Sequence, residues 1–148
     1  MDFFATTVWD VPIKEYPFVF PRPEELEAAR RALLERSPHV VAVQGAYGVG
    51  KTFFAKLYSE YFGEQYPGGI HYFAEPNQAQ SYMEQHLEQI QNCHDLTLYV
   101  IDETTSLVYD EYRLRKFLSR FDRFRDHPHI HLLLIGQTVP EPLIREGV

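Results

Sequence analysis

The residues best suited to chemistry in this sequence are a lysine and a threonine at the end of a glycine-rich stretch. The stretch reads Gly45-Ala46-Tyr47-Gly48-Val49-Gly50-Lys51-Thr52, which fits the pattern G-x-x-x-x-G-K-[ST]. Glycines let the backbone curl so that successive N–H groups point at one phosphate-sized concavity. A lysine there can reach phosphate oxygens, and a hydroxyl can bind the Mg²⁺ that accompanies them. The stretch therefore predicts a site for the phosphates of a nucleoside triphosphate.

Such a stretch works only between a strand and a helix. The apolar run Val40–Gln44 precedes it, and a helical pattern beginning at Phe53 follows and ends near Gly63. A helix starting here would aim its positive dipole end and its N–H groups at the phosphates. This context is that of the Walker A motif, or P-loop, so we predict that all residues from Gly45 to Phe53 contact nucleotide.

A pair of acids forms the second candidate site. Asp102 and Glu103 follow the apolar run Leu96–Ile101, which reads as a strand buried on both faces. Ligands collect at the carboxyl ends of strands in a parallel sheet, so these acids should face the P-loop. This is the Walker B pattern. We predict that Asp102 and Thr52 hold Mg²⁺. We also predict two catalytic residues: Glu103, which activates a water, and Lys51, which contacts the phosphates.

A further strand, Ile130–Ile135, ends at Gly136 and is followed by Gln137 and Thr138. If this strand lies between the first and third strands, its tip sits between the P-loop and the two acids. Gln137 or Thr138 would then touch the γ-phosphate or the attacking water. The alternative is that these are ordinary polar residues at the end of a strand.

The remaining pattern alternates strands with helices, which predicts an α/β fold with a mostly parallel sheet. The expected strands are 40–44, 70–74, 96–101 and 130–135, and the expected helices are 24–36, 53–63, 77–92 and 110–126. Residues 1–23 are rich in proline and aromatic side chains, and we expect an extended segment packed on the core. The nucleotide-binding domain should then comprise residues 24–148.

Composition narrows the class of protein. The chain has 148 residues, of which 45% are hydrophobic, and a net charge of −7, so bulk electrostatics disfavour nucleic acid and anionic membranes. Its single cysteine, Cys93, cannot form an internal disulfide. The N-terminus lacks the basic and apolar regions of a secretory signal, and no apolar run is long enough to span a membrane. We expect a soluble, cytoplasmic protein.

With these residues in view, the chain resembles the additional-strand class of P-loop NTPases, in particular STAND regulators (NB-ARC and NACHT type) and AAA+ ATPases. The stretch from Phe20 to Leu26 resembles the opening motif of those families, with Pro21 where glycine is usual, and Arg22 would by resemblance lie near the nucleotide base. Residues 66–73 resemble the approach to the second strand of NB-ARC proteins. Residues 133–138 resemble the sensor strand of AAA+ ATPases, including the ExeA and TniB-like group.

The resemblance implies a three-layer αβα P-loop NTPase that binds ATP (or ADP) and Mg²⁺. It also implies a fifth strand and a lid or winged-helix domain, which this sequence lacks, so the core should be C-terminally truncated relative to the family. Other domains or subunits would supply the lid and an arginine finger, an addition worth about 10³–10⁵ in rate in related chemistry. We therefore expect an ATP-binding regulatory core with slow hydrolysis, acting as a switch in a signalling or defence protein.

Two other functions stay open. The helix 110–126 carries a basic stripe at helical spacing, Arg113, Lys116, Arg120 and Arg123. It could contact a nucleic-acid backbone, as in an AAA+ DNA-linked helper, or be a solvated face, which the acidic composition favours. The other alternative is a nucleotide-binding module that does not hydrolyse. A kinase is disfavoured by the second acid, and the alternating His127, His129 and His131 read as the start of a strand, without a Cys or acid to complete a metal site.

Overall fold

The computed structural model describes residues 23–45 and 50–144. Within these ranges the α-helices are α1 (Pro23–Glu35), α2 (Gly50–Phe62), α3 (Pro76–Gln85), α4 (Leu87–Gln91), α5 (Glu111–Arg125) and α6 (Glu141–Ile144). The strands are β1 (Val40–Gln44), β2 (Ile70–Phe73), β3 (Thr97–Ile101) and β4 (Ile130–Gly136), and two short 3₁₀ turns are η2 (Gly63–Gln65) and η3 (Thr104–Leu107). The predicted N-terminal segment and its Arg22 lie outside the described residues.

The strands form one parallel sheet in the order β1-β4-β3-β2. The inserted strand β4 thus lies between β1 and β3. Gln137 and Thr138 could approach the candidate site only in this strand order. Both β3 and β4 are buried at every position, as expected for strands covered on both faces. The predicted α/β fold with a parallel sheet is confirmed.

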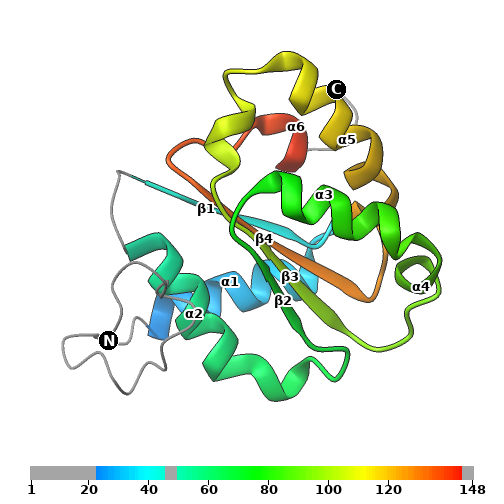
Figure 1. Cartoon of the computed structure of the whole chain (residues 1–148). Coiled ribbons are helices and arrows are strands. Elements are labelled where there is room, and N and C mark those ends of the chain that lie inside the picture. Colours follow the sequence, from blue (N-terminus) through cyan, green and yellow to red (C-terminus); the bar gives the residue numbers. More distant parts are fainter. Residues whose placement is uncertain (1–22, 46–49, 145–148) are drawn as a thin grey trace, which may run out of the picture.

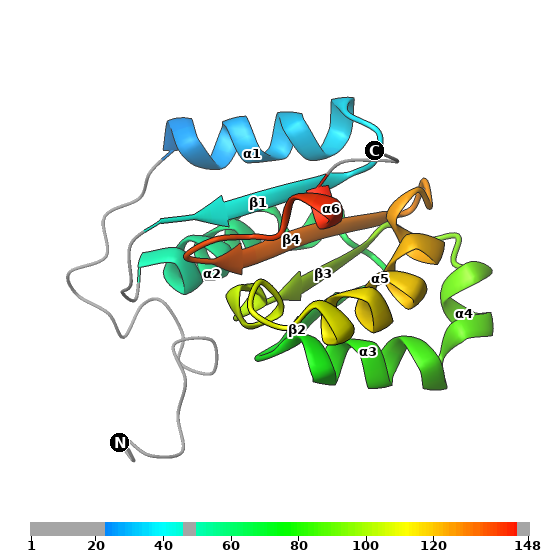
Figure 2. The ribbon, with the colours of Figure 1, turned by 90° about the horizontal axis from the view of Figure 1, so that it is seen from above.

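Helices cover both faces of the sheet, which makes three layers (Figures 1 and 2). Alternate residues of the strands point into two cores, because side chains of a strand alternate between faces. One core joins α1 and α2 to the sheet and contains Leu33, Tyr58 and Leu133. The other core packs α3, α4, α5 and α6 against the sheet and contains Phe121 and Leu134. The candidate site lies where the carboxyl ends of the strands emerge between these layers.

Local sequence explains most helix boundaries. Pro23 begins α1 and the next two residues are glutamates, the charge that a helix N-terminus favours. Asp110 caps α5, since its carboxylate accepts a hydrogen bond of 3.1 Å from the N–H of Arg113. Arg36, expected in the last turn of the first helix, lies just beyond its end at Glu35.

Two expectations about the elements are wrong. The helix predicted over 77–92 is two helices, α3 and α4, separated at His86, whose φ of −120° and ψ of 26° are not helical. The helix after the predicted P-loop begins at Gly50 rather than Phe53, so Lys51 and Thr52 belong to its first turn. Within the described ranges, no helix has both the length and the apolar composition to cross a membrane.

Candidate functional site

The site is built around Asp102, which directly follows β3 and is 6% exposed. A buried carboxylate requires hydrogen-bond donors, because burial removes the water that would solvate its charge. Asp102 Oδ2 accepts a hydrogen bond of 2.9 Å from the Thr52 hydroxyl and one of 2.7 Å from the Tyr72 hydroxyl. Asp102 Oδ1 accepts one of 2.8 Å from the N–H of Glu103. The acid is therefore held by α2, by β2 and by its own backbone neighbour.

The contact between Thr52 and Asp102 is the one that the two sequence motifs predict. The residues are 50 positions apart and lie on different elements, the first turn of α2 and the end of β3. A hydroxyl and a carboxylate are hard oxygen donors, and Mg²⁺ is commonly held by one or two such protein groups together with phosphate and water. The chemistry of this pair therefore fits a magnesium ion shared with a nucleotide.

Lys51 lies in the same turn of α2 as Thr52. Its Nζ donates a hydrogen bond of 3.0 Å to the carbonyl oxygen of Gly45, so the side chain folds back toward the residue that follows β1. Gly50 begins the helix and Phe53 is half-buried in the first turn. The remaining predicted cradle residues, Ala46, Tyr47, Gly48 and Val49, lie outside the described residues.

Glu103 follows Asp102 and turns the chain away from the sheet. Its φ of 56° and ψ of 33° are left-handed, a conformation rare for a residue other than glycine. The carbonyl oxygen of Glu103 accepts hydrogen bonds from the N–H (3.2 Å) and the hydroxyl (2.9 Å) of Ser106, which begin η3. The Glu103 side chain is exposed, at the same edge of the sheet as Thr52.

The end of β4 is fastened to η3 on one side and to β1 on the other. The Thr104 hydroxyl donates to the carbonyl of Ile135 at 2.9 Å, and the N–H of Thr138 donates to the Thr105 hydroxyl at 3.2 Å. The Gln44 side chain accepts a hydrogen bond of 2.9 Å from the N–H of Val139. Gln137 and Thr138 are exposed at this tip, between the ends of β1 and β3.

A hollow of about 680 Å³ lies between α1, β1 and the start of α2, and Gly45 and Gly50 are among its lining residues. Its lining is mainly small and apolar, with Ala28, Ala32, Val41 and Phe54, and it reaches Lys51. The hollow therefore connects an apolar wall to the lysine of the predicted phosphate site.

Tyr72 is the residue of this site that the sequence motifs did not indicate. It belongs to neither the Walker A nor the Walker B pattern. The strand containing it was predicted, but its contact with Asp102 depends on how β2 pairs with β3, which periodicity does not specify.

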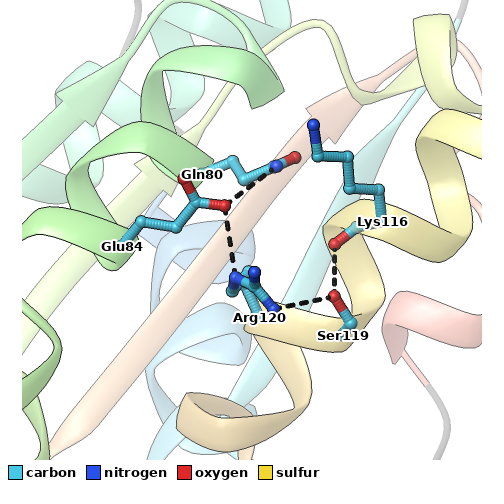
Figure 3. Close-up of polar contacts among 5 residues, drawn as sticks. All are labelled: Gln80, Glu84, Lys116, Ser119 and Arg120. Carbon is cyan, nitrogen blue, oxygen red and sulfur yellow. Dashed lines mark hydrogen bonds and ion pairs between the residues drawn. The ribbon is translucent and has the colours of Figure 1, made fainter.

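The basic stripe on α5 lies beside α3 rather than on an isolated face. Arg120 Nε is 3.2 Å from Glu84 Oε1, and Arg113 Nη2 donates to Asn77 Oδ1 at 3.1 Å. Figure 3 shows Arg120 reaching across to Glu84, which also accepts a hydrogen bond from Gln80. The stripe thus contributes in part to the packing of α5 against α3.

His131 is buried in the core beside α2, where its Nδ1 is 2.8 Å from the Tyr66 hydroxyl. His127 and His129 precede β4, and the N–H of His129 donates to His127 Nδ1 at 3.1 Å. Throughout the part of the chain that the structure describes, no group of three or more His, Cys, Asp or Glu side chains is arranged to hold a metal.

The sequence matches no protein-family model and no curated protein. Among solved structures, the fold is similar to that of a crystal structure described as a DNA replication initiation factor, with a TM-score of 0.54 and 18% sequence identity. The similarity covers 86% of this chain and 42% of that chain, so this chain corresponds to less than half of the longer protein. The comparison and the strand pairing together establish an α/β fold with a four-stranded, all-parallel sheet, similar to that of a DNA replication initiation factor.

Proposed function

We propose that this domain binds a magnesium–nucleoside triphosphate complex, ATP by resemblance, and hydrolyses it slowly. The observation that carries the proposal is the 2.9 Å hydrogen bond between the Thr52 hydroxyl and Asp102 Oδ2. An ion at the phosphates needs a hydroxyl and an acid side by side at the carboxyl edge of the sheet. Had these two groups lain on different sides of the sheet, they could not have shared one ion.

The residues from Gly45 to Phe53 would bind the phosphates, with backbone N–H groups and the Lys51 ammonium as donors. Lys51 would exchange its hydrogen bond to the Gly45 carbonyl for one to phosphate oxygens, where its charge is better compensated. The Thr52 hydroxyl can donate to Asp102 and still offer a lone pair to Mg²⁺. When bound, the ion would neutralise negative charge that develops on the phosphate oxygens.

Glu103 would orient and deprotonate the attacking water, because it is an exposed carboxylate adjacent to the buried acid. Gln137 and Thr138, at the tip of the inserted strand, would contact the γ-phosphate or that water. Arg22 would lie near the base, by resemblance alone. Turnover would stay slow until a lid or an arginine finger excludes water from the site and stabilises the developing charge.

We infer that the biological role is a nucleotide-controlled switch or assembly step in a larger signalling or defence protein. The additional-strand order β1-β4-β3-β2 supports a STAND or AAA+ type core. Partner domains or subunits would complete the site and read its nucleotide state. The same switch could also work by binding nucleotide without hydrolysing it. In that case Glu103 would have no catalytic role.

A DNA-linked AAA+ helper is the second candidate. The solved structure with a similar fold is described as a DNA replication initiation factor, and Lys116 and Arg123 of the basic stripe are exposed. However, Arg113 and Arg120 are engaged with α3, and exposed cations alternate with acids such as Asp122. Salt-sensitive DNA binding that is lost on charge reversal at Arg123 is the signature of this alternative.

The proposal is tested by thermal stabilisation with ATP, ADP or GTP in the presence of Mg²⁺. Ligand at 100 times its Kd stabilises a protein by about 2.7 kcal/mol, because binding draws the equilibrium toward the folded state. For a domain of this size that is a rise in Tm of about 5–10 °C. Lys51→Ala should lose most of this rise, since the phosphates lose their main cation.

The matched control is Lys56→Ala, which removes a lysine from the same helix. Lys56 pairs with Glu60 at 3.5 Å, on the part of α2 beyond the first turn. This variant should keep the full nucleotide-dependent rise even if its own Tm is lower. An unchanged Tm of the parent protein at millimolar ATP and Mg²⁺ would reject the proposed function.

A further inference from the structure

Three groups of the described residues donate to the Asp102 carboxylate, and the Tyr72 hydroxyl makes the shortest hydrogen bond, at 2.7 Å, against 2.8 Å from the Glu103 N–H and 2.9 Å from the Thr52 hydroxyl. It also shares Oδ2 with Thr52, the residue proposed to bind magnesium. Of the three donors, Tyr72 is the one that comes from outside the two nucleotide motifs. Its position therefore calls for an explanation beyond them.

The tyrosine is fixed at both ends. Its backbone belongs to β2, in the ladder where Tyr72 lies opposite Val100 of β3. Its ring packs against the core formed by α1, α2 and the sheet. The rigid ring thereby places the hydroxyl of this β2 residue beside the Asp102 carboxylate. A donor held in this way restricts the rotation of the carboxylate.

The Thr52 hydroxyl cannot fix the carboxylate in the same way once an ion is bound. Its oxygen would then be shared between Asp102 and Mg²⁺, so its position would follow the ion. The phenol hydroxyl of Tyr72, which donates to Oδ2, is not a proposed ligand of the ion and need not move when the ion binds. Hydrogen-bond partners of metal-binding groups commonly contribute 10–100-fold to metal affinity or activity, because they orient the ligand before the ion arrives.

We propose that Tyr72 is a positioning residue that holds the Asp102 carboxylate in the orientation needed to retain magnesium beside the Thr52 hydroxyl. This inference rests on the proposed function, since it assigns Tyr72 a task in the same site. The competing explanation is that Tyr72 only satisfies a buried carboxylate and so stabilises the fold. The two explanations differ in what happens to magnesium affinity separately from nucleotide affinity.

The test compares the parent protein with Tyr72→Phe, which removes one oxygen atom and keeps the ring. Binding of a fluorescent ATP analogue is measured in EDTA, and then the Mg²⁺ concentration for half-maximal effect is measured at a fixed concentration of the analogue. We expect the half-maximal Mg²⁺ concentration to rise roughly tenfold in Tyr72→Phe. The Kd for the analogue in EDTA should stay within twofold of the parent value. Both titrations are run well below the Tm of each variant.

Tyr61→Phe is the matched control, because Tyr61 is a 55% exposed tyrosine of α2 and should leave both quantities unchanged. An equal half-maximal Mg²⁺ concentration in Tyr72→Phe and the parent would overturn the positioning role. A parallel loss of binding in EDTA and in Mg²⁺ would also overturn it, in favour of a purely structural tyrosine. A parent protein that binds the analogue in neither condition would instead refute the proposed function, and the inference with it.

Discussion

Glu103 combines an exposed carboxylate with a left-handed backbone, at φ 56° and ψ 33°. For a residue with a Cβ this conformation costs about 1–2 kcal/mol relative to the right-handed one. The Asp102 carboxylate helps to hold it, by accepting a hydrogen bond from the Glu103 N–H, and so do the contacts of its carbonyl with Ser106. The domain thus keeps a strained residue next to its buried acid, which is typical of functional sites.

Replacing Glu103 separates the strain from the chemistry. Glu103→Gln keeps the backbone cost, so its free energy of unfolding should equal that of the parent. Glu103→Gly removes the cost, but the flexible glycine gives back about 0.5–1 kcal/mol in the unfolded chain. We therefore expect Glu103→Gly to be more stable than Glu103→Gln by about 0.5–1 kcal/mol in urea unfolding. Both variants should lose about 10²–10⁴-fold in phosphate release if Glu103 is the base.

Either half of this result can fail alone. Phosphate release by Glu103→Gln at the parent rate would rule out Glu103 as the base, whatever the stabilities. A Glu103→Gly protein less stable than Glu103→Gln would mean that this turn depends on a side chain at position 103 and that the backbone is not strained.

Residue types and spacing could predict that the Thr52 hydroxyl and the Asp102 carboxylate lie together, because each residue belongs to a local sequence pattern. They could not predict Tyr72. Its role depends on β2 lying beside β3 with Tyr72 opposite Val100, and a shift of one residue would turn the ring to the other face. The left-handed Glu103 was likewise not predictable, since neither glycine nor asparagine stands there.

At the scale of elements, the junction between β4 and η3 places Gln137 and Thr138 near the site. Gly136 permits this junction, because a Cβ there would lie 2.6 Å from Thr105 Oγ1 and 2.9 Å from Thr104 Oγ1. Both hydroxyls are already used, by Thr138 N–H and by the Ile135 carbonyl respectively. The absence of a side chain at Gly136 therefore lets η3 approach the end of the strand.

Gly136→Ala should destabilise the fold by about 1–3 kcal/mol, because the added methyl group would have to displace short, hydrogen-bonded side chains and the backbone behind them. The measurement is urea unfolding followed by circular dichroism. Gly63→Ala is the control, since a Cβ there meets Ile70 Cδ1 at an ordinary 3.6 Å. It should change stability by less than about 0.5 kcal/mol. Equal effects of the two substitutions would contradict the close approach at Gly136.

The elements show where periodicity is informative. It predicted the strands 130–135 and 96–101 well, because each is a continuous buried run. It merged α3 and α4 into one helix, because Met83 and Ile90 on either side of His86 pack in the same core and keep the apolar spacing. The short elements η3 and α6 contain four residues each, too few to show any period.

At the scale of the whole molecule, one sheet order brings together groups that are distant in sequence. With β4 between β1 and β3, the start of α2, the acid pair and the tip of β4 emerge at the same edge. On the face of the sheet that carries α1 and α2, a chain of buried side-chain hydrogen bonds also connects separate elements. The Tyr66 hydroxyl is 2.8 Å from the Tyr58 hydroxyl and 2.8 Å from His131 Nδ1, which ties α2 to β4 through the loop before β2.

This buried chain should make global stability depend on pH. Burial, assisted by the neighbouring His39 ring, lowers the pKa of His131 from 6.5 to about 4. Between these two pH values the histidine is protonated in the unfolded chain but neutral in the folded protein. The free energy of unfolding is therefore highest above about pH 6.5 and falls as the pH drops toward 4. At pH 5 the loss is about 2 kcal/mol, from roughly 1.4 kcal/mol per pH unit below 6.5.

His131→Leu should remove this contribution, because leucine fills the buried position without a titrating group and Tyr66 keeps its contact with Tyr58. The free energy of unfolding in urea is compared at pH 7 and pH 5, and the decrease should be smaller in His131→Leu than in the parent by about 2 kcal/mol. His94→Asn, which replaces an exposed histidine, should retain the full decrease of the parent. If His131→Leu instead loses as much stability as the parent over this range, the acid sensitivity comes from groups other than His131.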